Sequence, residues 1–192
     1  MKIGLFGGSF NPIHTGHTRL AQALLRQGWV EEMWILVSPL NPLKQGNTDL
    51  LNDQARLRLA QLAVEGKNGI HVSDFEMRLP RPSYMVKTLE CLRQDRPKDE
   101  FILVIGADNW LRFPQWKDSD EILRHHRLLI YPRPGCDIDE TTLPPNAQLV
   151  NTPLLDISST EIRHAIAKGH YHGRGLTPKV WHEIKKQNYY QI

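Results

Sequence analysis

The stretch KIGLFGGSFNPIHTGH (residues 2–17) decides the fold of this 192-residue chain. An apolar run at residues 3–6 ends in Gly7-Gly8, and apolar side chains then recur at helical spacing from Leu20 until Gly28. This order predicts a strand, a glycine turn and a helix. A second apolar run, at residues 33–37, begins about thirty residues after the first, which is the length of a right-handed βαβ unit.

The same alternation continues along the rest of the chain. It predicts further strands near residues 70–72, 101–105, 128–131 and 148–150, and helices at residues 54–64, 83–92, 160–167 and 178–186. We therefore expect an α/β fold, a Rossmann-like doubly wound and mostly parallel sheet with helices on both faces. The proline-rich residues 131–145 are expected to form a surface loop, so that residues 1–192 make a single domain.

The composition narrows the classes of partner. The chain has 24 basic and 21 acidic residues, well mixed along its length, which argues against nucleic-acid binding and is compatible with small anionic ligands. Cys91 and Cys136 have no neighbouring Cys or His at metal spacing, so neither a zinc site nor a disulfide framework is expected. Without a signal peptide or a long apolar span, we expect a cytoplasmic protein that does not contact the membrane. Assembly into a homo-oligomer stays open.

Ligands of such sheets bind beyond the carboxyl ends of the strands. Four segments follow expected strand ends, at residues 7–17, 38–44, 106–116 and 157–163. Gly7 and Gly8 allow main-chain N–H groups to face phosphate oxygens. Because neither GxGxxG nor GxxxxGK[ST] is complete here, the glycine pair alone leaves the ligand undefined.

His14 and His17 sharpen the hypothesis, because they lie three residues apart where the first helix begins and so share one helical face. Gly16 leaves that face open. Two imidazoles beside the free N–H groups of a helix start form a donor cluster suited to a polyphosphate. The alternative is that both histidines are surface or capping residues. The histidines at positions 125, 126, 170, 172 and 182 have no ligand spacing and are expected at the surface.

Two motifs carry a family resemblance. GGSFNPIHTGH (residues 7–17) resembles the first signature of the nucleotidyltransferases that use an HxGH motif, and ISSTEIR (residues 157–163) resembles their second signature, ISSTxIR. Between them, PLNPLK (39–44), PSYM (82–85), GAD (106–108) and FPQW (113–116) are similar to markers of the nicotinate-mononucleotide adenylyltransferase branch. Leu43 stands where many members have His, and Met85 where they usually have Thr.

The resemblance implies transfer of AMP from ATP to nicotinate mononucleotide, giving deamido-NAD and pyrophosphate. It assigns catalysis to His14, His17, Lys44 and Arg163. It implies that ATP is bound by Gly7, Gly8, Ser9, Phe10, Gly16, Ser158 and Ser159, and the mononucleotide by Tyr84, Met85, Asp108 and Trp116. Mg²⁺ is expected to be carried mainly by ATP, without metal ligands from the protein.

The residues of the second signature support the same chemistry. Ser158-x-x-Glu161 is a capping box that starts a helix and leaves its positive end free. Arg163 is expected in that first turn, where its planar fork suits two phosphate oxygens, although a solvated helix arginine is the alternative. Asp108 follows a strand end and suits a ribose hydroxyl or the metal, or else caps a helix. Trp116 suits stacking on the pyridine ring, or else belongs to the core.

Other functions stay open on these residues. A related enzyme could take nicotinamide mononucleotide or phosphopantetheine as the acceptor, but the chain length and the GAD…FxxW segment argue against phosphopantetheine. A regulatory module could bind nucleotides without turnover, because a fold does not prove activity. The intact histidine pair and Arg163 argue against that alternative.

Overall fold

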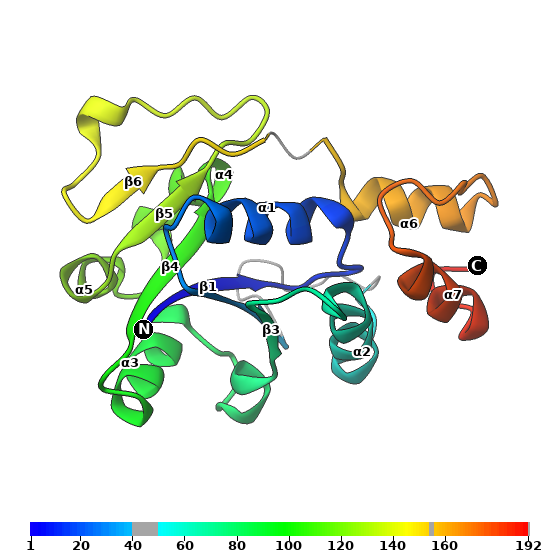
Figure 1. The fold of residues 1–192 in the computed structure, drawn as a ribbon, viewed down its shortest axis with the longest axis horizontal. Coiled ribbons are helices and arrows are strands. Elements are labelled where there is room, and N and C mark those ends of the chain that lie inside the picture. Colours follow the sequence, from blue (N-terminus) through cyan, green and yellow to red (C-terminus); the bar gives the residue numbers. More distant parts are fainter. Residues whose placement is uncertain (40–49, 154–155, 192) are drawn as a thin grey trace.

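The computed structural model describes residues 1–39, 50–153 and 156–191, and strands alternate with helices throughout (Figure 1). The strands are β1 (Lys2–Gly8), β2 (Glu32–Val37), β3 (Ile70–Ser73), β4 (Glu100–Gly106), β5 (Leu128–Tyr131) and β6 (Ala147–Leu149). The α-helices are α1 (Thr15–Arg26), α2 (Asp53–Val64), α3 (Met85–Asp95), α4 (Ala107–Trp110), α5 (Ser119–His125), α6 (Ser159–Ala167) and α7 (Pro178–Lys186). Short 3₁₀ helices are η2 (Phe75–Arg78), η3 (Phe113–Gln115) and η4 (Glu140–Thr142).

The six strands form one sheet in the order β3-β2-β1-β4-β5-β6. Every neighbouring pair is parallel, so the predicted doubly wound sheet is confirmed and, within the described residues, is parallel throughout. The strand order reverses between β1 and β4, and this is the position at which open α/β sheets bind ligands.

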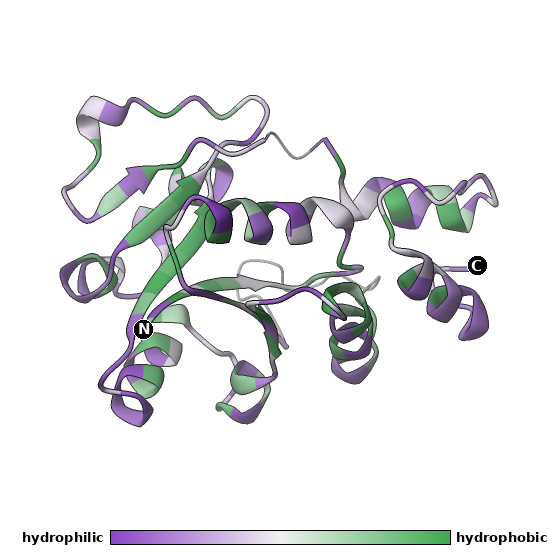
Figure 2. Ribbon diagram, viewed as in Figure 1, coloured by the Kyte–Doolittle hydropathy of each residue, from purple (hydrophilic) through white to green (hydrophobic). Residues whose placement is uncertain are grey.

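Two apolar cores cover the two faces of this sheet. Phe6, Ile102 and Leu129 point toward one core, which also holds buried side chains of α1, α2, α6 and α7. Their strand neighbours Leu5 and Leu103 point to the other core, with buried side chains of α3 and α5. Figure 1 shows α1 and α3 on opposite sides of β1, and Figure 2 shows the apolar central strands between helices whose outer faces are polar. Burial on both faces explains why these strands read as continuous apolar runs.

Local signals fix most helix boundaries. α7 starts at Pro178 as expected, behind Thr177, whose hydroxyl accepts a hydrogen bond from the N–H of Val180 at 3.4 Å. α3 starts at Met85, two residues later than predicted, because Tyr84 is extended with φ −116° and ψ 138°. The sequence did not predict α5, which has seven residues and buries Ile122 alone, too few apolar positions for a helical period.

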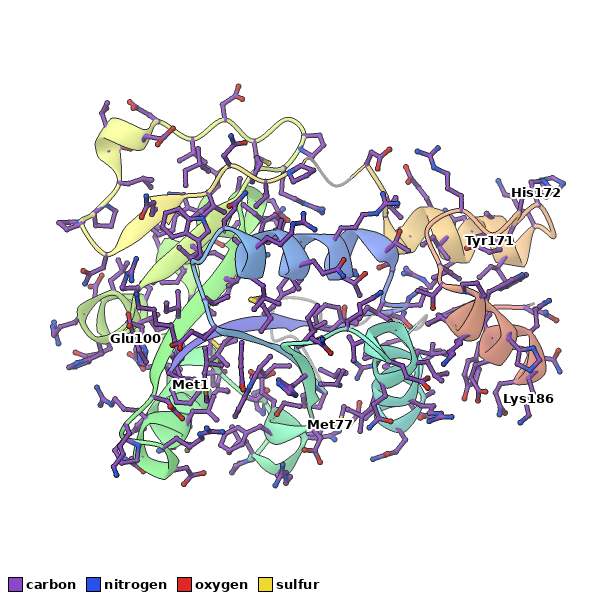
Figure 3. All side chains as sticks on the ribbon, in the orientation of Figure 1. Met1, Met77, Glu100, Tyr171, His172 and Lys186 are labelled. Carbon is purple, nitrogen blue, oxygen red and sulfur yellow. The ribbon has the colours of Figure 1, made fainter. Side chains whose placement is uncertain are left out.

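One expectation about histidines is wrong. His126 is buried, and its Nδ1 lies 3.1 Å from the carbonyl oxygen of Phe101. Since a carbonyl only accepts, Nδ1 carries the proton, and burial lowers the pKa of this imidazole. The other four are exposed, including His172, which Figure 3 labels beyond α6. In the described residues, no helix is both long and apolar enough to cross a membrane.

Candidate active site

A pocket opens at the carboxyl ends of β1 and β4, where the strand order reverses. Figure 3 labels Met1 and Glu100 beside the amino ends of these strands, at the opposite edge of the sheet. The pocket brings together predicted residues from three segments far apart in sequence. They are Gly7, Gly8 and Ser9 at the end of β1, Tyr84 and Met85 at the start of α3, and Trp116 after η3.

Glycines at the strand ends make this close assembly possible. A Cβ at Gly7 would lie 3.0 Å from the Cε of Met85, and one at Gly106 would contact the Asp108 carboxylate and lie 3.1 Å from the Tyr131 ring. Met85, one of the two residues that depart from the family pattern, therefore packs over the end of β1. Its side chain fills space that glycine leaves open.

His14 and His17 form a stacked pair at the start of α1. Their ring centroids lie 3.6 Å apart with an interplanar angle of 24°. His14 is the N-cap residue, and its backbone N–H donates a hydrogen bond to Nδ1 of His17 at 3.1 Å. The two side chains thus lie on one face of the helix start, as the spacing predicted.

Both imidazoles are neutral at pH 7 in this environment. Burial, followed by the positive charge of Arg133, lowers the pKa of His14 from 6.5 to about 4. Burial, with His14 and Arg133 as smaller causes, lowers the pKa of His17 well below its usual value. A neutral His17 that accepts at Nδ1 must carry its proton on Nε2. His17 therefore offers a single N–H donor of fixed direction.

Aromatic rings connect the histidine pair to the pocket. The Phe6 ring lies 5.7 Å from the ring of His17 and 5.8 Å from that of Tyr131, measured between centroids, and both Phe6 and Tyr131 line the pocket. Phe10 meets His17 edge to face at 5.0 Å. Phe6 thus lies near His17 and also forms part of the pocket wall, so the histidine pair lies beside the pocket.

Two side chains of the second signature donate hydrogen bonds to backbone carbonyl groups of the first signature. Ser159 Oγ donates to the carbonyl oxygen of Pro12 at 2.9 Å, and Arg163 Nη1 donates to that of Asn11 at 2.7 Å. Ser159 and Arg163 are four residues apart and share one face of α6. Because α6 begins at Ser159, Arg163 lies in the second turn rather than the first, which corrects our expectation.

The structure shows the half of the predicted capping box in which the Ser158 side chain accepts hydrogen bonds from the start of the helix. Ser158 Oγ accepts from the N–H groups of Thr160 and Glu161 at 3.2 and 3.5 Å. These bonds satisfy two of the free N–H donors at the start of α6.

Asp108 and Trp116 each had two interpretations. Gly106 is the N-cap residue of α4, so a capping role for Asp108 is wrong, and its Oδ1 lies 3.4 Å from Arg133 Nε. Trp116 packs on Phe113 with centroids 5.4 Å apart and also lines the pocket, so it belongs to both the core and the site. Its indole N–H is buried without a hydrogen-bond partner among the described residues.

Sequence reasoning missed a buried arginine behind the site. Arg56 is fully buried in α2, and its guanidinium donates to the carbonyl oxygens of Ser9 at 2.6 Å, Ser38 at 2.8 Å and Leu51 at 2.9 Å. It also pairs with Asp53 at 2.6 Å. Arg56 thereby ties the ends of β1 and β2 together. Nothing in the local sequence ARLRLAQLA distinguishes it from a solvated helix arginine.

Two further charged residues were missed. Arg133 follows the end of β5 by two residues, and this position after a strand end was the signal that could have found it. Glu76 is 3% exposed, lines the pocket and accepts from Ser38 Oγ at 2.5 Å and Thr88 Oγ1 at 3.0 Å. Burial raises the pKa of this carboxyl group. Lys44 and Leu43 lie outside the described residues.

Comparison with known proteins agrees with this geometry. Residues 5–165 match the model of the cytidylyltransferase-like family. A protein of Bacteroides thetaiotaomicron, named a probable nicotinate-nucleotide adenylyltransferase, is 48% identical over 97% of this chain and 92% of its own length. A protein of Flavobacterium johnsoniae with the same name is 40% identical over 100% of both chains.

Solved structures support the fold. The nicotinic acid mononucleotide adenylyltransferase of Plasmodium falciparum, in complex with NaAD, superposes with a TM-score of 0.83 over 98% of this chain and 97% of that one, at 21% identity. A likeness at this identity speaks for the fold alone. The matches in sequence go further, and with them the chain belongs to the nicotinate-nucleotide adenylyltransferase family of cytidylyltransferase-like proteins.

Proposed function

We propose that this chain transfers AMP from ATP to the 5′-phosphate of nicotinate mononucleotide, releasing pyrophosphate and giving nicotinate adenine dinucleotide. Its membership of the family supports the reaction. The observation that carries the proposal is the stacked His14–His17 pair beside a pocket at the strand reversal. The Plasmodium falciparum relative was solved with NaAD, a compound of the same class as the proposed product.

The reaction places few demands on proton transfer. A nucleotide 5′-phosphate has a second pKa of about 6 and is already an anionic nucleophile at neutral pH. One of its oxygens forms a bond to the α-phosphorus of ATP, while the bond from that phosphorus to the bridging oxygen breaks and pyrophosphate leaves. The enzyme has to bring two polyanions together and stabilise the charge that develops on the transferring and leaving phosphates.

Donors for that charge surround the loop after β1. We assign stabilisation of the transferring phosphate to His14 and to the Nε2–H of His17, and binding of the triphosphate to Arg163 and Lys44. Arg133 lies close enough to lower the pKa of both histidines, so it adds positive charge at the same place. The remaining contacts to ATP are assigned to the glycines and to the two motif ends, at Gly7, Gly8, Ser9, Phe10, Gly16, Ser158 and Ser159.

The pocket suits the mononucleotide. Tyr84 and Met85 stand at the start of α3, where the first N–H groups of the helix lack partners within the helix and can bind the nicotinate carboxylate. Trp116 supplies an aromatic face for the pyridine ring. We assign the ribose hydroxyls to Asp108, which precedes the pocket residue Asn109. Lys117 adds a cation at this end, with its Nζ 4.7 Å from the Tyr84 ring centroid.

We propose that a magnesium ion arrives with the nucleotide. Mg²⁺ is commonly bound through substrate phosphates and one or two carboxylates. The alternative role of Asp108, in place of binding the ribose, is to orient this ion. When bound, the ion would neutralise charge on the phosphates. A cytoplasmic location stays a prediction, and assembly into a homo-oligomer stays open.

The test is pyrophosphate release from ATP and nicotinate mononucleotide, measured against a blank without the acceptor. Release that requires the acceptor supports the proposal. A protein that binds ATP and the mononucleotide but releases no pyrophosphate would be a nucleotide-binding regulator. Release with phosphopantetheine or nicotinamide mononucleotide alone would keep the adenylyl transfer and replace the acceptor.

A further inference from the structure

The segment after α7 returns to the loop that follows β1. The hydroxyl of Tyr190 donates a hydrogen bond to Oδ1 of Asn11 at 2.8 Å. Figure 1 shows this end of the chain, marked C, on the side of the molecule where α6 and α7 lie. Tyr190 belongs to none of the motifs that carry the proposed function.

Asn11 is a junction between several elements. Its Oδ1 also accepts from the N–H of Leu51 at 3.2 Å, and its carbonyl oxygen accepts from Arg163 at 2.7 Å. The residue is 3% exposed and stands three positions before His14. Whatever fixes Asn11 therefore fixes both the start of the histidine motif and the resting position of the Arg163 guanidinium.

The backbone indicates that this contact is maintained against strain. Tyr190 has φ 62° and Phe10, next to Asn11, has φ 45°. Bulky residues rarely adopt positive φ, and such conformations persist only where surrounding contacts determine them. At Tyr190 the aromatic ring packs against the core of the α1 face, and the hydroxyl contact with Asn11 directs it.

The hydroxyl of Tyr190 is a donor at neutral pH, because even an ordinary tyrosine has a pKa of about 10. Burial raises the pKa of its phenol, while Arg163 and Arg56 act in the opposite direction. Both arginines are close enough to influence the phenol, so Tyr190 lies among the groups that hold the loop after β1.

We propose that Tyr190 is a positioning residue for the ATP site: through Asn11 it holds the histidine motif and Arg163 in the arrangement that receives the triphosphate. The proposal rests on the proposed function for the identity of the ligand, ATP. It does not depend on which acceptor the enzyme uses.

Tyr190→Phe tests the proposal, with Tyr189→Phe as the matched control. Tyr189 packs against the same core, and its hydroxyl makes no hydrogen bond with the described residues. Loss of the donor to a buried acceptor is expected to raise the KM for ATP in Tyr190→Phe by about fivefold or more, while the KM for the mononucleotide stays unchanged. Tyr189→Phe is expected to keep both constants.

Calorimetric binding of a non-hydrolysable ATP analogue separates this proposal from the acceptor assignment. A weaker Kd in Tyr190→Phe alone supports the proposal even if nicotinate mononucleotide proves not to be the acceptor. A Tyr190→Phe protein with a lower Tm but unchanged Kd and KM would show a merely stabilising contact and would overturn it. Equal losses in both tyrosine variants would do the same.

A double-mutant cycle tests the route through Asn11. If Tyr190 acts through this residue, Tyr190→Phe should change the Kd of the ATP analogue by less than about twofold in an Asn11→Ala background. Additive losses would show that Tyr190 acts elsewhere.

Discussion

The backbone N–H of His14 donates to Nδ1 of His17, so the first residue of the histidine motif sets the tautomer of the second. The imidazole of His17 is thereby left with its proton on Nε2, ready to donate to a phosphate oxygen. The same bond fixes the ring orientation before any ligand arrives. Preorganised donors of this kind stabilise developing charge without reorganisation during the reaction.

His17→Ala should therefore lower kcat by about 10²-fold or more, with a modest loss of ATP affinity, because the lost donor acts on the transferring phosphate. His14→Ala should behave similarly. His182→Ala, at an exposed position of α7, is the control and should match the parent. A His17 or His14 variant that keeps more than half of the parent kcat would show that the pair does not act in catalysis.

The pH dependence of stability should reveal the buried imidazole of His14. Its folded pKa of about 4 lies below the unfolded value of 6.5, so the unfolded chain binds more protons between these values and stability falls as the pH falls through this window. From pH 7 to pH 5 this residue should cost about 2 kcal/mol of unfolding free energy. In chemical denaturation, His14→Gln should lose that much less than the parent; identical pH slopes would show that His14 titrates normally.

Arg163→Lys should be a poor enzyme, because an ammonium keeps the charge but loses the planar fork that can hold two phosphate oxygens. We expect kcat/KM for ATP to fall by about tenfold or more, equivalent to about one charge-assisted hydrogen bond. Steady-state kinetics with varied ATP measures it. If the lysine variant has the kinetics of the parent, Arg163 does not act on ATP and its role is limited to the hydrogen bond with Asn11.

Arg56→Lys should lower stability, since lysine cannot reach the carbonyl oxygens of Ser9, Ser38 and Leu51 together. We expect a loss of about 2 to 4 kcal/mol in unfolding free energy, because the buried carbonyl oxygens lose their donors. Urea denaturation measures the change. Arg58→Lys, two residues along the same helix, is the control, and an equal loss there would remove the special role of Arg56.

The fold was largely predictable because its strands are buried on both faces. Each central strand reads as an apolar run, but the glycine pair at positions 7 and 8, which was expected to form a turn, makes the last two residues of β1. The short α5 escaped prediction because a seven-residue helix with a single buried apolar side chain has no detectable period. α3 starts two residues later than predicted because Tyr84 has an extended backbone and is the N-cap residue.

The motif residues of the site were predictable, and their supports were not. His14, His17 and Arg163 are recognisable from motif spacing, and the family assignment that followed from the motifs is confirmed. Arg56 and Tyr190 contact the same loop from positions far along the chain, and no local pattern connects them to it. Their roles depend on which carbonyl or amide oxygen they reach, which only the folded arrangement determines.

Substrate choice depends on the start of α3. Nicotinate mononucleotide carries a carboxylate where nicotinamide mononucleotide carries an amide. Main-chain N–H groups near Met85 can pair with either oxygen of the carboxylate, but not with the NH₂ of the amide. The amide would turn its NH₂ toward at least one donor, at a cost of about 1 to 3 kcal/mol for each unpaired group. Met85→Thr should leave this preference unchanged because the donors belong to the backbone, whereas Trp116→Ala should weaken both substrates through lost stacking.

The ratio of kcat/KM for nicotinate mononucleotide to that for nicotinamide mononucleotide tests the assignment most directly. Both values come from pyrophosphate release at saturating ATP with the parent protein. We predict a preference of about 10²-fold or more for the nicotinate form, corresponding to two mismatched donors. Equal values, or a preference for the amide, would contradict the assignment of nicotinate mononucleotide as the acceptor.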